Sequence, residues 1–491
     1  MALRLCLLVA MIRAISASPR NRRGAWGRGA VVSAAALLLA ACSTTRPWMN
    51  PPITADSPGA STPIAAPAVD AAGGARTTPS IIAAVTLSGG GARAAAFGLG
   101  VLQELKETQF TWEGRQTSLL DEVGLVSGVS GGSVLAAYYA AFGDETFTRF
   151  EHDFLLVNFQ SSLVGDLTSP SSLYSLTSPW WGRSDILAQR LDPVFRGMSF
   201  GDLRRKRPKP QLLVTATDLS TGAPFEFTPE QFALICSDLD SVPLSFAVAA
   251  SAAVPILLSP ITVHNYAGSC PQSAPLYELP ADGNLSARLL NLIAQSCRDS
   301  AKRPYIHLVD GGLVDNLGVR SLVDRVTAGG SLETSFGALP PGSVHRIVLI
   351  SVNSERDTAE RIDTSDRVPG VGQVMDSLIF GAGSRVTTET TEIVNDVARR
   401  LSEQLAADRS RPGSPFAPDA EIHVINVSLR GLHDPAVRRT LMNVPTAFTI
   451  LPIQVRQLQI AGRRALRESP EFQRLRRSLA AEPEVALADM P

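Results

Sequence analysis

Apolar runs separated by helix-compatible segments dominate the chain from Ile81 onward. We predict β-strands at residues 81–87, 123–129, 211–217, 305–309, 346–352 and 421–427. Segments compatible with helices lie at residues 92–107, 134–141, 243–253, 371–407 and from 435 to the end. Strands that alternate with helices form a mostly parallel sheet covered by helices on both faces. The pattern therefore predicts the α/β fold class.

The chain before Ile81 has a different character. Arginines are spread up to Arg28, a short apolar run covers residues 30–41, and Cys42 ends that run. We predict that residues 1–41 are a signal peptide, because the run is too short for a permanent membrane span. Residues 42–80 are rich in proline, alanine, serine and threonine, and this composition predicts a disordered tether.

The four residues Leu39–Cys42 (Leu-Ala-Ala-Cys) resemble the bacterial lipobox, in which the cysteine is acylated and becomes the mature N-terminus. The resemblance implies a protein of the bacterial cell envelope that is anchored to the membrane through lipid at Cys42. Ser43 at the next position implies, by the same resemblance, sorting to the outer membrane. An uncleaved anchor and a secreted protein with an unrelated cysteine are the open alternatives.

Two further regions stand outside the alternating pattern. Residues 151–192 are irregular but carry many leucines and aromatic residues, so they form either a lid that meets lipid or a helical cap packed on the sheet. We favour the cap, because apolar side chains are usually buried. Residues 356–491 are predicted to be a C-terminal helical extension with one added strand, packed on a domain at residues 81–355.

Composition narrows the choice of partners. The chain has 491 residues, 45% hydrophobic composition and a net charge of −1, and removal of six leader arginines would leave −7. An acidic protein is a poor candidate for binding nucleic acid. Three cysteines remain in the body, and we predict a Cys270–Cys297 disulfide from their proximity in sequence, with Cys236 as the free thiol. The sequence has no metal-ligand cluster, so we expect neither a metal nor a cofactor.

The five residues Gly128–Gly132 (Gly-Val-Ser-Gly-Gly) lie between a predicted strand and a predicted helix. In such a sharp turn the central residue adopts a strained conformation, and Gly128 and Gly132 remove side chains that would clash with it. Ser130 would then be an exposed nucleophile at a helix N-terminus, where negative charge is favoured. The alternative is that Ser130 merely caps the helix.

A glycine loop follows the first predicted strand and opens the first predicted helix. Its residues Gly89, Gly90 and Gly91 let several backbone N–H groups converge on one point, as an oxyanion hole requires, and Arg93 follows closely. The same spacing also fits a dinucleotide fingerprint, but no clear acid follows at the expected distance. Binding of a phosphate group stays open as a minor alternative.

A serine nucleophile also needs a base. Of the six histidines, only His345, His423 and His433 follow the serine in the order that α/β-hydrolases use, and none lies in a distinctive loop. Asp310, in contrast, ends a predicted strand and is followed by Gly311 and Gly312. Such an aspartate can deprotonate a serine directly when its environment raises its proton affinity.

The glycine loop, the Gly128–Gly132 turn and Asp310-Gly311-Gly312, in this order, resemble the patatin-like phospholipase family. The segments 215–219, 249–255 and Asp315-Asn316 resemble further parts of it, and the resemblance covers residues 81–353. It implies a three-layer α/β/α sandwich and a Ser130–Asp310 catalytic dyad without histidine. It also implies an oxyanion hole at Gly89, Gly90 and Gly91, supported by Arg93 and by the glycines of the two motifs.

The activity implied by the resemblance is hydrolysis of acyl esters in phospholipids, lysophospholipids or neutral lipids, without a metal. The expected partners are therefore an acyl-lipid substrate and the membrane to which Cys42 is anchored. Two alternatives remain open at this point. An acyltransferase would use the same dyad with an alcohol as the acceptor, and a non-catalytic envelope lipoprotein would bind lipid without cleaving it.

Overall fold

The computed structural model describes residues 43–54, 80–270, 283–332, 339–355, 366–377 and 382–480. Cys42 and the signal-peptide region lie outside these residues. The chain divides into two compact units. One consists of Met1–Pro47 and Asp166–Trp181, and the other of Trp48–Gly165 and Gly182–Pro491. Within the small unit, Ser43 N–H donates to Thr177 Oγ1 at 2.7 Å, and the guanidinium of Arg46 lies 4.2 Å from the ring centre of Trp180.

The large unit is built on one sheet with the strand order β10-β9-β1-β4-β5-β8-β7, and β6 pairs with β5. The strands are β1 (Ile81–Leu87), β4 (Val123–Val129), β5 (Gln211–Asp218), β6 (Ala223–Glu226), β7 (Ile261–His264), β8 (Tyr305–Val309), β9 (Val344–Asn353) and β10 (Phe416–Ser428). From β10 to β5 all neighbours are parallel. The predicted strands are thus present, and the sheet is mostly parallel.

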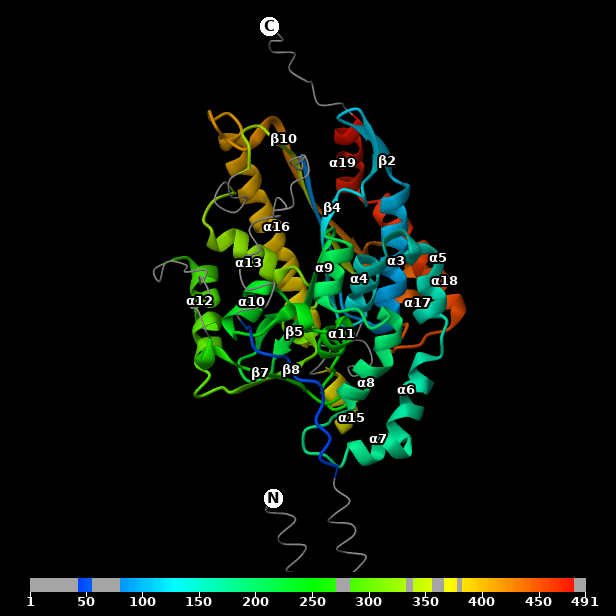
Figure 1. Cartoon of the computed structure of the whole chain (residues 1–491). Helices are drawn as coiled ribbons and strands as arrows, with labels where there is room; N and C mark the ends of the chain where they lie inside the picture. The colour runs from blue at the N-terminus through cyan, green and yellow to red at the C-terminus, as the bar shows by residue number, and fades with distance from the viewer. Residues whose placement is uncertain are drawn as a thin grey trace, which may run out of the picture. The chain divides into compact units, whose positions relative to one another are not determined.

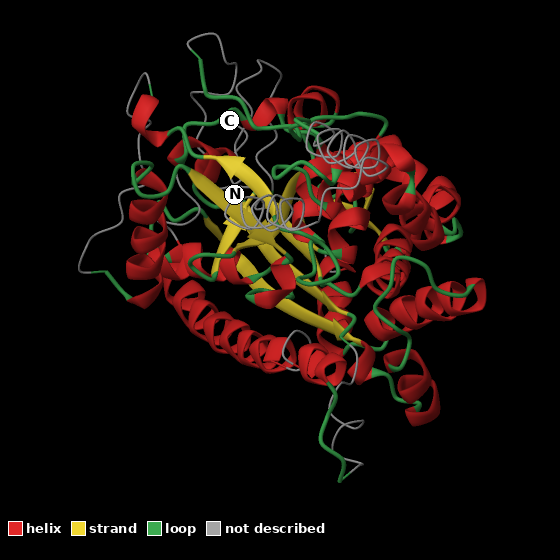
Figure 2. Cartoon of the chain, turned by 90° about the horizontal axis from the view of Figure 1, so that it is seen from below, coloured by secondary structure: helices red, strands yellow, loops and turns green. Residues whose placement is uncertain are grey.

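Helices cover both faces of this sheet, so the fold is a three-layer α/β/α sandwich, as predicted (Figures 1 and 2). On one face lie α3 (Gly91–Glu107), α4 (Gly131–Phe142) and α18 (Pro452–Arg467), and on the other α13 (Arg320–Ala328) and α16 (Ala382–Asp408). The other helices are α5 (Thr146–Phe150), α6 (Phe159–Thr168), α7 (Pro170–Ser175), α8 (Arg183–Leu191), α9 (Phe200–Lys206), α10 (Pro229–Leu234), α11 (Leu244–Ser251), α12 (Leu285–Arg298), α15 (Val371–Asp376), α17 (Pro435–Met442) and α19 (Pro470–Ala480).

The central strand β1 illustrates why this sequence forms a buried parallel sheet. Its residues Ile81, Ala83, Val85 and Leu87 lie on one face and are almost fully buried. On the other face Thr86 is buried and residues 82 and 84 are partly buried, so both faces of the strand are covered, as is usual in a parallel sheet. Helix starts follow familiar chemistry, as at α17, where the Asp434 side chain accepts hydrogen bonds from the N–H groups of residues 436 and 437. Pro435 at the first helical position removes one N–H that would lack a partner.

Some elements differ from the sequence pattern. Residues 151–191 are largely helical, and in the large unit Phe154, Leu155 and Phe159 are buried, in agreement with a cap rather than an exposed lid for this part. The pattern missed the antiparallel hairpin of β2 (Gln109–Trp112) and β3 (Arg115–Ser118), whose strands have only four residues each. Hairpins this short carry too few alternating positions to be recognised.

The C-terminal region shares the core of the rest of the large unit. Strand β10 extends the central sheet beside β9, and α18 packs along α3. Arg467 on α18 donates two hydrogen bonds to the carboxylate of Glu104 on α3, at 2.8 and 2.6 Å. The amphipathic α18 and α19 bury Leu458, Leu466, Phe472 and Leu475. Their apolar faces are therefore used for packing within the protein.

Residues 48–54, from the stretch predicted to be a tether, belong to the large unit. The Asn50 side chain bonds both ways with the backbone of His264, from Nδ2 to the carbonyl at 2.9 Å and from the His264 N–H to Oδ1 at 2.7 Å. Ile53 N–H donates to the Cys236 carbonyl at 2.9 Å, and the rings of Trp48 and Phe246 lie 4.7 Å apart. These contacts hold the segment beside α11 and β7. Residues 55–79 lie outside the described part.

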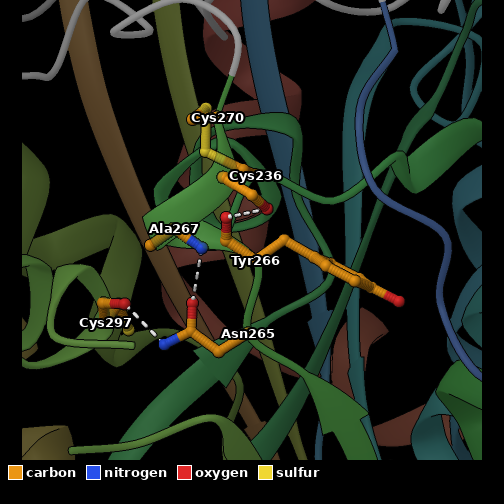
Figure 3. Close-up of a disulfide and its surroundings, with 7 residues drawn as sticks. Cys236, Asn265, Tyr266, Ala267, Cys270 and Cys297 are labelled. Carbon is orange, nitrogen blue, oxygen red and sulfur yellow. Dashed lines mark hydrogen bonds between the residues drawn. A yellow bond between two sulfur atoms is a disulfide. The ribbon is translucent and has the colours of Figure 1, made fainter. Parts of the chain in front are cut away.

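The predicted disulfide is wrong. The disulfide joins Cys236 to Cys270, with Cα atoms 5.5 Å apart, and Cys297 is the buried free thiol (Figure 3). A hydrogen bond of 2.9 Å from Tyr266 N–H to the Ile235 carbonyl brings the two chain segments together. Asn265 Nδ2 instead holds the carbonyl of Cys297 at 2.7 Å from the other side. The fold therefore brings Cys270 next to Cys236, although Cys297 is closer to Cys270 in sequence.

No helix in the described residues is long and apolar enough to cross a bilayer.

Candidate active site

Ser130 stands alone between the end of β4 and the start of α4. Its backbone has φ 50° and ψ −121°, a left-handed conformation that is unfavourable for a residue with a side chain. The Ser130 side chain makes no capping hydrogen bond to α4. The strained turn therefore agrees with a nucleophile elbow and not with a helix cap.

Hydrogen bonds hold the Ser130 backbone in this conformation. Its N–H donates to Ser251 Oγ at 2.8 Å, and Ser251 Oγ in turn donates to the Thr215 carbonyl at 2.6 Å. On the other side, Ser133 Oγ donates to the Ser130 carbonyl at 2.6 Å. Ser251 ends α11 and Thr215 lies in β5, so three separate elements fix the turn. Sequence reasoning noted Ser251 only as part of a family segment and missed its contact with Ser130.

Strand β5 also sets the distance between Ser130 and Asp310. Val129, which precedes the serine, pairs with Thr215, and Val309, which precedes the aspartate, pairs with Thr217. The sheet was predicted to be mostly parallel, and β8 is one of its antiparallel strands, since it pairs with β5 in the antiparallel direction. The two strands pair only at their last residues, so their carboxyl ends still meet. Asp310 thus reaches the same edge of the sheet as Ser130.

The Asp310 carboxylate is almost fully buried, with 7% of its surface exposed. It accepts a hydrogen bond from Gly312 N–H at 2.8 Å and another from the Ser130 side chain. Burial raises the pKa of Asp310 to about 6, although both hydrogen bonds favour the ionised form and oppose this rise. A carboxylate with such a pKa is mostly ionised at pH 7 yet binds a proton far better than an ordinary aspartate.

The N-termini of α3 and α4 meet beside Ser130. A Cβ added to Gly131 would lie 2.1 Å from the Gly91 carbonyl oxygen, so only glycine permits this approach of two backbones. Gly90 has φ 138° and Gly91 has φ 61°, conformations that favour glycine. The first amides of each helix lack intrahelical partners and carry the positive end of the helix dipole. The corner therefore favours negative charge next to the serine.

The predicted glycine loop lies against the serine, but its three amides are not equivalent. A Cβ added to Gly89 would lie 3.4 Å from Ser130 Cβ, so the loop and the serine are adjacent. Gly89 N–H already donates to the Asn316 carbonyl at 3.0 Å. Among the described residues, the N–H groups of Gly90 and Gly91 make no such backbone hydrogen bond, so these two remain the candidates for an oxyanion hole. The remaining predicted glycines lie at close backbone approaches or at the aspartate: Gly128, Gly132, Gly311 and Gly312.

Arg93 is buried, with 2% exposed surface, and braces the glycine loop from behind. Its Nε donates to the Ser354 carbonyl at 2.8 Å and its Nη1 to the Val444 carbonyl at 2.6 Å. Ser354 Oγ in turn donates to the Gly89 carbonyl at 3.1 Å. Ser354 and Val444 were not predicted to matter, since both lie far from the loop in sequence and carry no motif.

The three candidate histidines bond to other residues. His345 Nδ1 lies 2.6 Å from Asp419 at the amino end of β9, which is the edge of the sheet opposite to Ser130. His423 is buried between Glu421 and Glu471, and His433 bonds to Glu468. In the described part of the chain, none of them hydrogen-bonds to Ser130 or Asp310, and no group of three His, Cys, Asp or Glu residues there could hold a metal ion.

Part of the chain that includes Ser130 and Asp310 is similar to a known family. Residues 85–323 match the family model described as patatin-like phospholipase. None of the curated protein sequences compared matches the chain. Among solved structures, human GIVD cytosolic phospholipase A2 has 14% identity and a TM-score of 0.40, over 82% of this chain and 60% of the human one. This chain therefore corresponds to less than two thirds of that enzyme.

A second solved structure, VipD from Legionella pneumophila, has 12% identity and a TM-score of 0.31, with 82% of this chain and 67% of VipD covered. The family model spans both the elbow and the aspartate that the fold brings together. Over residues 85–323, this chain is therefore similar to the patatin-like phospholipase family.

Proposed function

We propose that this protein is a lipid acyl hydrolase of the phospholipase A or lysophospholipase type, in which Ser130 is the nucleophile and Asp310 the base. The family supports a lipid esterase as the general activity. The observation that carries the finer proposal is the hydrogen bond between the Ser130 side chain and the buried Asp310, whose pKa burial raises to about 6. A base needs both this contact and this proton affinity.

In the proposed reaction, Asp310 accepts the hydroxyl proton of Ser130 while Ser130 Oγ attacks the ester carbonyl carbon. The N–H groups of Gly90 and Gly91 stabilise the oxyanion, helped by the two helix N-termini. The oxyanion collapses, and Asp310 gives its proton to the departing alcohol. An acyl-enzyme remains on Ser130. Water then attacks it, Asp310 accepts a proton from the water, and that proton returns to Ser130 as the fatty acid leaves.

The reaction needs no metal, because a carboxylate supplies the base and backbone amides supply the electrostatic stabilisation. Ser251, Arg93 and Ser354 act as positioning residues: they hold the serine backbone and the glycine loop and do not touch the ester. We further propose that Cys42 carries the lipid that anchors the protein in the bacterial envelope, at the outer membrane. Mass spectrometry of the mature N-terminal peptide tests this part, and an unmodified Cys42 would contradict it.

A lipid-panel assay tests the proposed activity. The full chain should release fatty acid from phospholipids or lysophospholipids, and Ser130→Ala should release none above background. Added glycerol or lysophospholipid as acceptor should leave the yield of free fatty acid unchanged. Transfer of most acyl groups to the acceptor would instead indicate an acyltransferase with the same dyad. Binding of lipid without turnover would indicate a lipid-binding protein.

A further inference from the structure

We infer that the loop 254–259 is the edge of the active site that enters the membrane and places the side chains of Ile256 and Leu257 among the acyl chains of a phospholipid bilayer. We call this loop the lip. The inference rests on the proposed function, since it describes how that active site would reach a lipid in a bilayer.

The lip presents two neighbouring large apolar side chains to solvent. Ile256 is 57% exposed and Leu257 is 68% exposed. Ile256 also has φ 74°, a conformation that is a genuine outlier for a β-branched residue. Strain of this kind persists only where the surroundings impose it, and it is concentrated at sites that bind or react. The protein therefore keeps Ile256 and Leu257 exposed to solvent at the cost of backbone strain.

Hydrogen bonds on both sides impose this shape. Leu258 N–H donates to the Val254 carbonyl at 2.9 Å, which closes the loop on itself. Ser184 Oγ donates to the Ser259 carbonyl at 2.5 Å, and Arg183 Nη2 donates to the Ile256 carbonyl at 2.7 Å. These hydrogen bonds thus fix the conformation of the lip. Arg183 is itself exposed, and its cationic side chain lies where a lipid phosphate would meet an apolar pair inserted below the headgroups.

The lip is joined directly to the catalytic elements. It follows α11, whose last residue Ser251 accepts the hydrogen bond from Ser130 N–H. The carbonyl of Ala253 accepts a hydrogen bond of 3.0 Å from Asp310 N–H. Leu257 is four positions after Ala253, so the chain can carry Leu257 no more than about 14 Å from that bond. A lipid drawn up at the lip therefore has only a short path to the dyad.

The segment 48–54 supports an orientation in which the lip faces the bilayer. Trp48 packs on Phe246 of α11, the helix that leads into the lip. Trp48 is six positions after Cys42, and a chain of this length spans at most about 22 Å. A free tether over residues 42–80 would have a typical span of about 35 Å and a far larger maximum. With acylation at Cys42, as proposed, the α11 side of the large unit stays close to the bilayer.

Another exposed apolar surface competes for the same role. Leu285, Leu289 and Leu292 form a stripe on α12, and Leu292 is 60% exposed. We assign the bilayer to the lip, because Ala253, the residue just before the lip, accepts a hydrogen bond from Asp310 N–H, whereas α12 packs on α13. Leu292→Ser therefore serves as the matched control, with similar exposure and the same chemical change.

The test uses the mature chain from residue 42 with Cys42→Ser, so that no acyl chain masks the lip. Co-sedimentation measures binding to vesicles of phosphatidylcholine and phosphatidylglycerol at a ratio of 7 to 3. The variant Ile256→Asn/Leu257→Ser should bind on the order of 100-fold more weakly, about tenfold for each apolar side chain. Asparagine is chosen because it tolerates a positive φ. Leu292→Ser should bind within twofold of the parent. Parental binding by the double variant, or loss of binding in Leu292→Ser, would overturn the assignment.

A second variant gives a positive signal that does not depend on lost binding. Leu257→Trp should show a blue shift of its added tryptophan emission on vesicles and quenching by brominated lipid, and an unchanged emission would refute insertion. Rates of hydrolysis distinguish an effect on membrane binding from an effect on the chemical step. The ratio of the rate on vesicles to the rate on soluble p-nitrophenyl butyrate should fall at least tenfold in the double variant. If the parent hydrolyses neither substrate, the proposed function is refuted. If the double variant still binds vesicles more weakly than the parent in that case, the role of the lip in membrane binding remains supported.

Discussion

Replacing Asp310 with asparagine should make the protein inactive and more stable. Burial raises the pKa of the Asp310 carboxylate to about 6 from its ordinary value of 3.8. Between these two pH values the folded protein holds a proton that the unfolded chain has lost, so stability falls as the pH rises. The two pKa values differ by about 2, and each pKa unit corresponds to about 1.4 kcal/mol. At pH 7.5 the ionised Asp310 therefore lowers the free energy of unfolding by about 3 kcal/mol.

Asp310→Asn removes this cost and keeps an oxygen for the hydrogen bond from Gly312 N–H. Urea unfolding at pH 7.5 should therefore give a free energy of unfolding about 3 kcal/mol above the parent. At pH 4 the gain should fall below about 1 kcal/mol, since Asp310 is then protonated in the folded parent. Fatty-acid release should be lost at both pH values, because asparagine cannot accept the serine proton. In the parent, kcat/KM should fall about tenfold for each pH unit below 6.

Asp185 supplies the matched control. Burial raises its pKa to about 6 as well, and it caps α8 by accepting the hydrogen bond from Gly182 N–H. Asp185→Asn should gain stability at pH 7.5 in the same way and keep full hydrolysis. An Asp310→Asn variant that hydrolyses lipid, or whose stability relative to the parent is the same at pH 4 and pH 7.5, would refute the reasoning.

Three further predictions follow from single contacts. Ser251→Ala removes the acceptor of Ser130 N–H and should lower kcat about tenfold with little change in KM, since an unpaired buried amide costs about 1–3 kcal/mol; a rise in KM alone would argue against a positioning role. Gly131→Ala would set a Cβ 2.1 Å from the Gly91 carbonyl oxygen, so it should abolish hydrolysis and lower the urea midpoint; an active variant would show that the two helix N-termini can separate. Cys236→Ala/Cys270→Ala opens a 34-residue link and should cost about 4 kcal/mol in urea unfolding, which reduction of the parent should reproduce; loss of the disulfide in Cys297→Ala would contradict the observed pairing.

The strands and the main helices could be read from the sequence because they are long and strongly patterned. Ile81–Leu87, Val123–Val129 and Tyr305–Val309 have the bounds that were predicted. Ser130 and Asp310 were also predicted to follow strands, but the antiparallel pairing of β8 with β5 was not predicted. The motif located the two residues at strand ends, but pairing direction depends on contacts between strands that local patterns do not carry.

The supporting residues could not be found in this way. Ser354 and Val444 hold Arg93 through their backbone carbonyls, and a carbonyl is present in every residue, so no residue type marks such a role. The prediction of the disulfide was wrong for a related reason, since the spacing of cysteines along the chain does not show which segments come together at the edge of the sheet. The contacts of Asn50 with His264 likewise join residues far apart in sequence, and composition alone made that segment look unstructured.

The most direct test of the Ser130–Asp310 dyad is site mapping with a fluorophosphonate probe, followed by mass spectrometry of the labelled peptide. The account predicts one adduct, on Ser130, formed at pH 8 by the parent and more than about 100-fold more slowly by Asp310→Asn. An adduct on a different residue, or equal labelling rates in the two proteins, would contradict the dyad.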